Sequence, residues 1–385
     1  MKKNWEIKKL STVLKIQNGY AFNSKLFTTE TGTPLIRIRD IKKGDGTETN
    51  FKGEYDKKYE VNAGDLLIGM DGEFGCYEWK GGTALLNQRV CRLQEFNDRI
   101  YSRFLFYGIN KYLKDIEDVT AFATVKHISS KQIENIEIPL PSFSEQHRIV
   151  SILDEAFDAI SRAKINAEQN LQNAKELFAS YLQGVFATQE VGWEEKTLSD
   201  VCEYDKTPNK RNNLPYVGLE DIQSNTGKLI GPLIPRSVKS LTFYFNNKHV
   251  LYGRLRPYLN KVLLPDFEGH CSTEVFPIKP KKDVLDRSFL FRWLIAKETM
   301  KKINATWTGA TLPRANMNTV LEFKINMPPI ETQKVIVKNF DALSVETKRL
   351  EDIYQQKIAD LEELKKSVLQ KAFNGELKLQ HELSR

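Results

Sequence analysis

The sequence predicts an α+β protein made of two homologous globular domains, each followed by a long helix, with the two helices pairing as an antiparallel coiled coil. Three observations predict this architecture: one pattern occurs twice, each globular part mixes short β-rich runs with loops, and each connector carries an apolar seam. The expected domains are residues 1–144 and 188–330, and the expected helical segments are residues 145–187 and 331–385.

The internal repeat is clearest at the end of each domain. The stretch "PLPSFSEQHRIVSILD" from Pro139 aligns without a gap with "NMPPIETQKVIVKNFD" from Asn326, so that Gln146 matches Gln333. The match continues upstream, where "ATVKHISSKQIENIEIPLP" lies over "ATLPRANMNTVLEFKINMP", and it then needs small shifts of the kind that loop insertions produce. A period of about 190 residues is too long for a solenoid or propeller repeat, so each copy is expected to be a whole domain with an appendage.

Composition indicates a folded, soluble protein. Of 385 residues, 41% are hydrophobic and 28% are charged, which is enough to bury two ordinary cores. No signal peptide or membrane span is expected, because the basic N-terminus lacks a following apolar stretch and the most apolar run, "FLFRWLIA", is short and contains an arginine. Four widely separated cysteines without a CxxC pair favour reduced thiols in a cytoplasmic protein and no metal site.

The positive charge is concentrated in the globular domains. Lys and Arg outnumber Asp and Glu by 22 to 19 in residues 1–144 and by 21 to 15 in residues 188–330. The same counts are 4 to 6 in residues 145–187 and 10 to 10 in residues 331–385. This distribution suits two domains that each touch a polyanion and connectors that touch protein. A mild excess is also typical of an ordinary solvated surface, and the charge of the first domain does not exclude that interpretation.

Each connector predicts a long helix with a heptad-like apolar seam. Each seam contains one extra four-residue step, from Ala167 to Leu171 and from Tyr354 to Ile358, at homologous positions. Such a discontinuity locally unwinds a supercoil, so helices that share it at matching points can stay in register, and we infer that the two are partners. The alternative is a long amphipathic helix packed on its own domain. The residues expected to pair are Ile149, Leu153, Ile160, Leu171 and Phe178 in the first helix, and Phe340, Leu343, Leu350, Ile358, Leu361 and Leu364 in the second.

Helix boundaries are predicted by proline and glycine. Each helix is expected to start after a proline-rich stretch, where Ser144 or the pair Glu331 and Thr332 supplies side-chain oxygens to the first turn. The second helix is expected to stop near Gly375.

Each globular part is predicted to be α+β. Runs such as "GDLLIGMDG" and "STEVFPIKP" are typical of strands, and one helical run precedes each joint, at "YSRFLFYGINKYLKDI" and "RSFLFRWLIAKETMKKI". The sequence carries no signature of a phosphate-binding loop, a zinc protease, a nucleophile elbow or a DNA N-methyltransferase. It therefore predicts a binding protein without catalytic residues on this chain.

The stretch "GRLRPYLNK" supplies the strongest candidates for nucleic-acid contact in the second domain: Arg254, Arg256, Tyr258, Asn260 and Lys261. Arginine forks suit guanine edges and phosphates, asparagine suits adenine, and tyrosine can stack or touch the sugar-phosphate backbone. The alternative is a solvated strand face.

The first domain has a glycine-rich loop with two acids at this place, and its cations lie elsewhere. The candidates there are Arg37, Arg39, Lys42, Lys43, Asn87, Gln88 and Arg89. The joint segments "TVKHISS" and "TLPRANM" occupy equivalent positions, which adds Lys126, His127 and Arg314 as lesser candidates. For the cluster from Arg37 to Lys43, nucleic-acid contact and a solvated surface are about equally good interpretations.

The duplicated plan resembles the specificity (S) subunits of Type I restriction-modification enzymes. The resemblance covers the full chain and rests on the repeated joint and on the phrases "GDLLIGMDGEFG", "LNQRV" and "GATLPRANM". The second joint departs from the family pattern at Glu331-Thr332-Gln333. The resemblance implies a cytoplasmic, non-catalytic reader of double-stranded DNA with two target-recognition domains, each reading one half of an asymmetric split target.

The resemblance also implies protein partners. It implies that the chain recruits two methyltransferase (M) subunits and, through them, ATP-dependent motor nuclease (R) subunits, with the paired helices fixing the unread gap. It implies no cofactor on this chain, with S-adenosylmethionine, ATP and Mg expected on the partners, and no membrane contact.

Two other interpretations stay open at the sequence level. One is the DNA-recognition part of a single-chain restriction-methylation system, which would be fused to a methyltransferase. The other is a coiled-coil adaptor without a nucleic-acid role, which would show no salt-dependent binding to duplex DNA.

Overall fold

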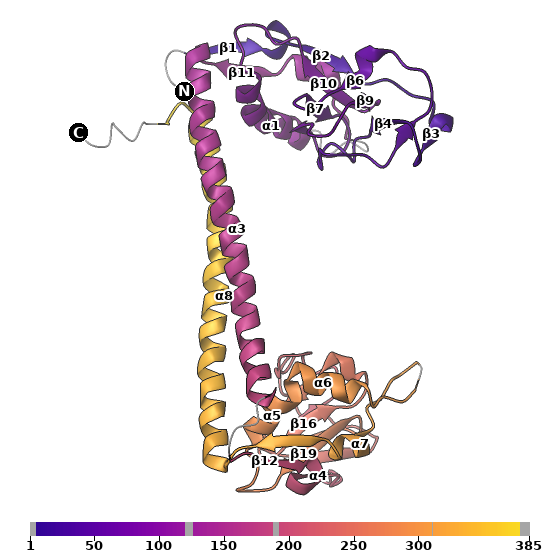
Figure 1. The fold of residues 1–385 in the computed structure, drawn as a ribbon, viewed down its shortest axis with the longest axis vertical. Helices are drawn as coiled ribbons and strands as arrows, with labels where there is room; N and C mark the ends of the chain where they lie inside the picture. The colour runs from indigo at the N-terminus through magenta and orange to yellow at the C-terminus, as the bar shows by residue number, and fades with distance from the viewer. Residues whose placement is uncertain (1–4, 120–125, 188–191, 310, 378–385) are drawn as a thin grey trace, which may run out of the picture. The chain divides into compact units, whose positions relative to one another are not determined.

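The computed structural model describes residues 5–119, 126–187, 192–309 and 311–377. The chain divides into two compact units, of which unit 1 comprises residues 1–165 and 358–385 and unit 2 comprises residues 166–357. Each unit holds one globular domain and one part of each long helix, and Figure 1 labels the elements.

The described residues of the domain of unit 1, here the first domain, form three sheets. Strand β1 (Glu6–Lys9) pairs antiparallel with β11 (Glu137–Leu140). A four-stranded antiparallel sheet has the order β2-β10-β7-β8, with bounds Lys15–Asn18, Val90–Gln94, Leu66–Gly69 and Gly75–Glu78. A five-stranded sheet has the order β3-β5-β4-β9-β6, with bounds Phe27–Thr28, Asn50–Phe51, Thr33–Ile36, Ala84–Leu86 and Glu60–Val61. The helices before the joint are α1 (Ser102–Val119) and α2 (Ser130–Glu134), and the 3-10 turns are η1 (Leu10–Thr12), η2 (Ser24–Leu26) and η3 (Lys57–Tyr59).

The domain of unit 2, here the second domain, repeats this plan. Strand β12 (Glu194–Thr197) pairs antiparallel with β20 (Lys324–Met327). A four-stranded sheet has the order β13-β19-β16-β17, with bounds Cys202–Tyr204, Val275–Pro280, Val250–Gly253 and Val262–Leu263. A smaller sheet has the order β14-β18-β15, with bounds Tyr216–Val217, Gly269–Ser272 and Thr242–Phe245. Its helices are α4 (Leu198–Val201), α5 (Arg287–Ile295), α6 (Lys297–Asn304) and α7 (Met317–Leu321), and its 3-10 turn is η4 (Pro257–Leu259). The matching strand order agrees with a duplicated domain.

One inner strand of each four-stranded sheet, β7 or β16, is buried on both faces, which explains its continuous apolar sequence. In β7, Leu66 and Ile68 pack with α1, whereas Leu67 joins the cluster on the opposite face. In β16, Val250 and Tyr252 pack on the side of α5, and Leu251 faces the smaller sheet. Successive side chains of a strand point to opposite faces, so one apolar run serves two cores.

The two long helices are α3 (Phe143–Ala187) and α8 (Ile330–Phe373). Each begins one or two residues before the predicted side-chain oxygens, and Ser142 Oγ accepts a hydrogen bond from the backbone N–H of Glu145 at 3.4 Å. The predicted stop at Gly375 is confirmed, because this residue has φ +71 and the following Glu376 N–H donates back to the carbonyl of Lys371. A left-handed residue in that position ends a helix.

The two helices pack antiparallel within each unit. In unit 1, Ile149 and Leu153 near the start of α3 share a cluster with Val368 and Ala372 near the end of α8. In unit 2, the order is reversed, and Leu182 near the end of α3 packs with Phe340 and Ile336 near the start of α8. An antiparallel coiled coil is therefore the arrangement of the pair, as the matched discontinuity predicted.

Most predicted pairing residues occupy this seam, with one correction. Ile149, Leu153, Ile160 and Phe340 are buried, and the half-buried ones are Leu171, Phe178, Leu343, Leu350, Ile358 and Leu361. Leu364 is 49% exposed, so its assignment to the seam is wrong. The heptad spacing instead passes through Lys365, whose Nζ lies 5.2 Å from the centre of the Phe157 ring, because an aliphatic lysine stem can cover apolar surface while its ammonium stays in water.

A buried glutamine joins the first domain to α3. Gln146 has no exposed surface, and its Nε2 donates to the carbonyls of Arg99 at 2.8 Å and Pro141 at 3.0 Å. Its Oε1 accepts from the backbone N–H of Tyr101 at 2.8 Å. The side chain thereby satisfies main-chain groups at the domain end and at the helix start.

The second domain uses the homologous glutamine in the same way. Gln333 is fully buried, and its Nε2 donates to the carbonyls of Val284 at 3.0 Å and Pro328 at 2.9 Å, while its Oε1 accepts from Asp286 N–H at 2.8 Å. The repeated motif in the sequence is therefore a repeated structural joint.

Truncation of Phe340 is expected to be among the most destabilising changes in the helix pair. Its ring is fully buried. The ring centre lies 5.1 Å from that of Tyr181 and 6.1 Å from those of Phe178 and Phe186. Phe340→Ala should cost about 3–5 kcal/mol because it leaves a cavity, measured by urea unfolding with hydrogen exchange of the α8 amides. Val345, which is 72% exposed on the same helix, supplies the control, since Val345→Ala should change stability by less than about 0.5 kcal/mol. Equal losses in the two variants would contradict the seam.

Three further findings bear on the sequence predictions. All four cysteines lie in the described part of the chain, are buried and form no disulfide, and burial raises the pKa of Cys91 and Cys202 to about 12. Within the described ranges, no helix is both long and apolar enough to span a membrane. Nor do three or more His, Cys, Asp or Glu side chains gather there in a group that could hold a metal ion.

Candidate nucleic-acid interface

In the second domain, Arg254 and Arg314 converge on one carboxylate. Glu274, in the turn between β18 and β19, accepts from Arg254 Nε at 2.8 Å and from Arg314 Nε at 3.0 Å. Burial raises the pKa of Glu274, but the hydrogen bonds from the two arginines outweigh burial, so the net pKa lies below the usual glutamate value. The carboxylate therefore stays charged, and the ion pairs weaken only as the pH falls through that lowered pKa.

Glu274, Arg254 and Arg314 are here called the arginine clamp, because the carboxylate orients both guanidinium groups. Among the described residues, Arg254 hydrogen-bonds through Nε and keeps both terminal nitrogens for another acceptor, and its guanidinium carbon lies 5.3 Å from the centre of the Phe276 ring. Arg314 uses Nη1 in a longer contact of 3.4 Å with the carbonyl of Leu312. An arginine fixed through its Nε loses little side-chain entropy when its terminal N–H groups bind a ligand. This arrangement favours recognition of a guanine edge or a phosphate.

The turn after β16 carries exposed groups beside this clamp. Arg256 is exposed in a left-handed conformation, with φ 51, and its backbone N–H donates to the carbonyl of Pro313. Tyr258 is 46% exposed and makes an edge-to-face contact, at 6.5 Å between ring centres, with Trp307, which is 51% exposed. Exposed aromatic side chains beside arginines are typical of surfaces that contact bases or sugars.

Two predicted contact residues of this turn have structural roles instead. Asn260 is only 2% exposed, and its Nδ2 donates to the carbonyl of Ile295 at the break between α5 and α6. The predicted base contact by Asn260 is therefore wrong, because its amide satisfies a carbonyl that the helix break frees. Lys261 Nζ donates to the carbonyl of Leu219 at 2.6 Å, so its ammonium is already engaged within the domain.

In the first domain, the acid of the equivalent cluster is Asp71, which lies in the loop between β7 and β8. Glu274 of the second domain lies in the turn before β19. Asp71 accepts from Arg89 Nη1 at 3.2–3.3 Å and lies 2.6 Å from His127 Nδ1. Arg89 is exposed at φ +74, and Gln88 beside it is exposed. Gln88, Arg89 and His127 line a shallow depression of about 350 Å³.

A second depression of the first domain is lined by residues from the predicted Arg37–Lys43 cluster. Arg39 and Lys42 lie beside Asp71 and Glu73 around a volume of about 380 Å³, and Lys42 pairs with Glu73 at 3.1 Å. Arg37 and Lys43 are exposed. The structure thus brings three separate segments of the sequence, residues 39–42, residues 88–89 and His127, together around the loop between β7 and β8.

Asn87 and Lys126 differ from their predicted roles. Asn87 is 7% exposed, and its Oδ1 has no hydrogen-bond partner within the described residues, so a direct contact of this buried amide with DNA is wrong for this conformation. Lys126 donates to the buried Glu117 at 3.1 Å, and this hydrogen bond lowers the pKa of Glu117. Lys126 therefore neutralises an internal acid.

The two clusters occupy equivalent places with their charges exchanged. Arg89 directly precedes β10 and Glu274 directly precedes the matching strand β19. The backbone of His127 forms an isolated antiparallel β-bridge with Asp71 in the first domain. The backbone of Arg314 forms the matching bridge with Leu255 in the second domain. Because the scaffold is the same and the polar groups differ, each surface offers a different pattern of donors and acceptors.

Two groups of surface residues were not predicted as contacts. Trp307 lies apart from "GRLRPYLNK" in the sequence, and only folding places it beside Tyr258. The stretch "NKRNN" (Asn209–Asn213) lines a polar cavity in the second domain, and its two cations among asparagines were a signal that could have been used.

Comparisons with known proteins agree with this description. The model of the Type I restriction modification DNA specificity domain matches residues 2–169 and again residues 190–363. The EcoBI specificity subunit of Escherichia coli is 26% identical over 98% of this chain and 87% of its own length. The MjaVIII specificity subunit of Methanocaldococcus jannaschii is 23% identical over 88% of this chain and 84% of its own length.

Solved structures share the fold over nearly the full chain. The HsdS subunit from Thermoanaerobacter tengcongensis has a TM-score of 0.64 at 17% identity and covers 98% of both chains. A chain from work on the complex assembly and conformational transition of the type I R-M system has a TM-score of 0.68 at 19% identity, over 97% of this chain and 99% of its own. Since the family model matches two segments that together make up most of the sequence, the chain belongs to the family of Type I restriction modification DNA specificity domains and carries two copies of that domain.

Proposed function

We propose that the chain is the DNA-reading subunit of a cytoplasmic Type I restriction-modification complex and reads a bipartite, asymmetric target. Residues 1–144 and 188–330 are the two target-recognition domains, and each reads one half of the target. The observation that carries the proposal is the pair of clusters around Asp71 and Glu274, which lie at equivalent positions of two duplicated domains and present different polar groups.

Base reading by the second domain is assigned to the arginine clamp. The side chains of Arg254 and Arg314 are 33% and 39% exposed and keep donors that Glu274 does not take, and a planar fork suits the two acceptors of guanine in the major groove. Arg256 and Tyr258 are exposed beside the clamp and suit contacts with the phosphate and sugar. In the first domain, Gln88, Arg89 and His127 fill the corresponding role.

The paired helices are proposed to bind the partner subunits and to set the unread gap. Several apolar side chains on the helices lie outside the seam and in solvent: Ile165, Leu177, Val335, Val345 and Ile353 are each more than 40% exposed. Exposed apolar side chains on a helix can pack against a protein partner. We assign the helices to two methyltransferase (M) subunits, through which the motor nuclease (R) subunits join, and assign all catalysis to those partners.

The test uses the chain assembled with its methyltransferase and a target defined by methylome sequencing. Arg254→Ala should weaken binding of that target by roughly 1–3 kcal/mol and relax specificity in one half-site only. Glu274→Gln keeps the side-chain shape but releases both arginines, so it should relax the same base positions while strengthening binding to random duplex.

Lys282→Ala is the matched control, because Lys282 is an exposed cation beyond the opposite end of β19 from Glu274. It should leave every base preference intact. If Arg254→Ala and Glu274→Gln also leave the methylated sequence unchanged, the clamp does not read bases and the assignment fails.

A further inference from the structure

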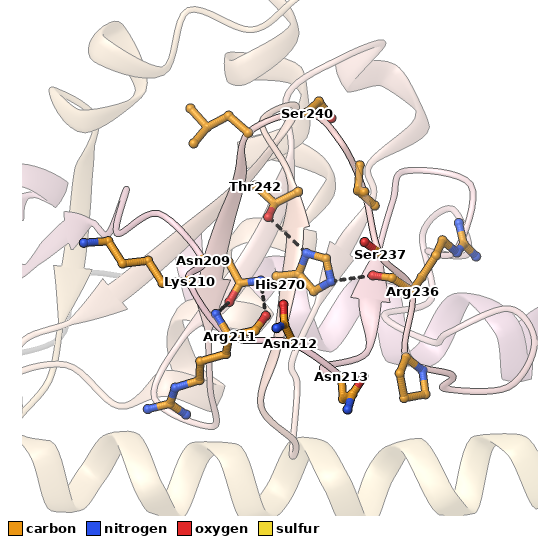
Figure 2. Close-up of a pocket in the computed structure, with 13 residues that line it drawn as sticks. Asn209, Lys210, Arg211, Asn212, Asn213, Arg236, Ser237, Ser240, Thr242 and His270 are labelled. Carbon is orange, nitrogen blue, oxygen red and sulfur yellow. Dashed lines mark hydrogen bonds between the residues drawn. The ribbon is translucent and has the colours of Figure 1, made fainter.

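The second domain contains a polar cavity of about 610 Å³ that the cluster around Glu274 does not include (Figure 2). Its lining contains three cations, Lys210, Arg211 and Arg236, and no Asp or Glu. The other lining residues are Asn209, Asn212, Asn213, Pro235, Ser237, Val238, Ser240, Leu241, Thr242 and His270. A concave surface rich in cations and amides but without acids suits a ligand that is anionic and rich in hydrogen-bond acceptors.

A buried histidine forms the floor of the cavity. His270 is 4% exposed, and Figure 2 shows it between Thr242 and Arg236. Its Nε2 donates to the carbonyl of Arg236 at 2.9 Å, and its Nδ1 lies 3.0 Å from the Thr242 hydroxyl. Both ring nitrogens are therefore engaged, so His270 holds the two walls of the cavity together and leaves ligand contact to the exposed residues.

The cations of the rim are held in place by acids and aromatic rings outside the lining. Arg211 pairs with Glu268 at 2.9 Å and lies 4.9 Å from the centre of the Tyr244 ring. Arg236 lies 5.1 Å from the centre of the Tyr216 ring, and its terminal nitrogens lie 3.7 Å from Glu220 and 3.8 Å from Asp221. Lys210 is exposed, and no ion pair engages it within the described residues. Two cations are thus pre-oriented and one is available to an incoming anion.

The first domain fills the equivalent place with an apolar core. In the second domain, His270 of β18 pairs with Tyr216 of β14. In the first domain, Leu85 of β9 pairs with Leu35 of β4, so Leu85 occupies the place of His270. Leu85 is fully buried with Phe22 and Phe51. The polar floor therefore belongs to the second domain alone of the two. The same scaffold accepts an apolar core at this place in the first domain.

A short stretch of chain joins the cavity to the arginine clamp, from β18 into the turn that follows it. His270 is in β18, and Glu274 follows four residues later, a span of at most about 13 Å in extended chain. That length is about four base-pair steps of B-DNA. A duplex in contact with the clamp can therefore place its backbone over the cavity.

We propose that this cavity grips the phosphodiester backbone of the target DNA beside the second half-site, a proposal that rests on the function proposed above. Lys210 neutralises a phosphate, Arg211 and Arg236 donate their remaining N–H groups to phosphate oxygens, and the asparagine and serine side chains also donate to them. The cavity supplies affinity that is independent of base sequence, whereas the clamp around Glu274 supplies the reading.

The experiment measures dissociation constants over a salt series for the chain assembled with its methyltransferase. Two duplexes are compared, the target and a duplex with its second half-site scrambled. Lys210→Ala, Arg211→Ala and Arg236→Ala should each weaken both duplexes by the same factor and reduce the slope of log K against log salt by about 1, with the methylated sequence unchanged. Lys210→Arg should retain the slope, and Lys282→Ala should leave the slope at its original value.

Several outcomes would overturn the proposal. One is an unchanged slope in Lys210→Ala, whose exposed side chain makes this variant the least disruptive to folding. A loss confined to the intact target would mean that the cavity reads bases. Saturable binding of adenosine monophosphate, with no effect of the variants on DNA, would identify a free-nucleotide site.

The proposed function fails on a different result. If the assembled wild-type protein shows no preference for any duplex, DNA reading itself is wrong. If that preference exists and the three variants leave the salt slope unchanged, only the phosphate grip is wrong.

Discussion

Replacement of residues 188–330 by the equivalent region of a relative with another target is expected to change one half of the recognised sequence completely. The other half and the gap should stay as they were. The physical reason is that direct base readout is local, and every contact assigned to the second half-site comes from elements between β12 and β20. Methylation mapping of cells that carry the hybrid gives the result.

Two controls make the exchange decisive. Replacement of residues 1–144 in the same way should change only the opposite half-site, and a hybrid with both domains replaced should show both new halves with the original gap. A hybrid of one domain that alters both halves or the gap would refute the model of two independent readers.

Lengthening both long helices by one heptad is expected to change the gap while both half-sites remain readable. Seven residues add about 10 Å to a helix, which corresponds to about three base pairs along the DNA axis. The insertions belong at facing points of unit 1, after Ile160 in α3 and before Leu361 in α8, near the ion pair between Lys164 and Glu362. Insertion at facing points keeps every later pair of the antiparallel seam in register.

The matched control is the same insertion in α3 alone. This change shifts one seam against the other, so it should destabilise the helix pair and abolish methylation. If the double insertion leaves the mapped gap at its original length, the helices do not set the spacing.

The sequence predicted the parts of the fold that depend on local patterns. The heptad seam predicted α3 and α8, and the repeated joint predicted a duplicated domain. Strand order was not predictable. Strand β2 pairs with β10 across a long stretch of chain, and the sequence of neither strand specifies which strand it pairs with. The single helical run predicted before the second joint is two helices, α5 and α6, separated by an extended Ala296. Tertiary packing overrides helix propensity at that point.

The candidate site was predictable by residue type but not by geometry. Two arginines and a tyrosine in "GRLRPYLNK" predicted a contact surface at this turn, but no sequence pattern indicated that Glu274 would hold Arg254 and Arg314 together. Asn260 shows the opposite error, since an amide beside arginines suits adenine until folding buries it against Ile295. Ala123 and Ala310, which open the gap-free upstream match between the copies, lie outside the described residues.

The buried glutamines at the two joints have a consequence for how such a protein can evolve. Gln146 and Gln333 hydrogen-bond only to main-chain carbonyls and N–H groups of their domains. A main-chain carbonyl is present in every amino acid, and the N–H is absent only from proline. Substitutions at the domain positions that these glutamines contact therefore leave this part of the attachment in place, whereas the ion pairs Arg103–Asp154 and Arg292–Asp341 depend on domain side chains. Natural selection can vary side chains around each joint while the glutamine hydrogen bonds are kept.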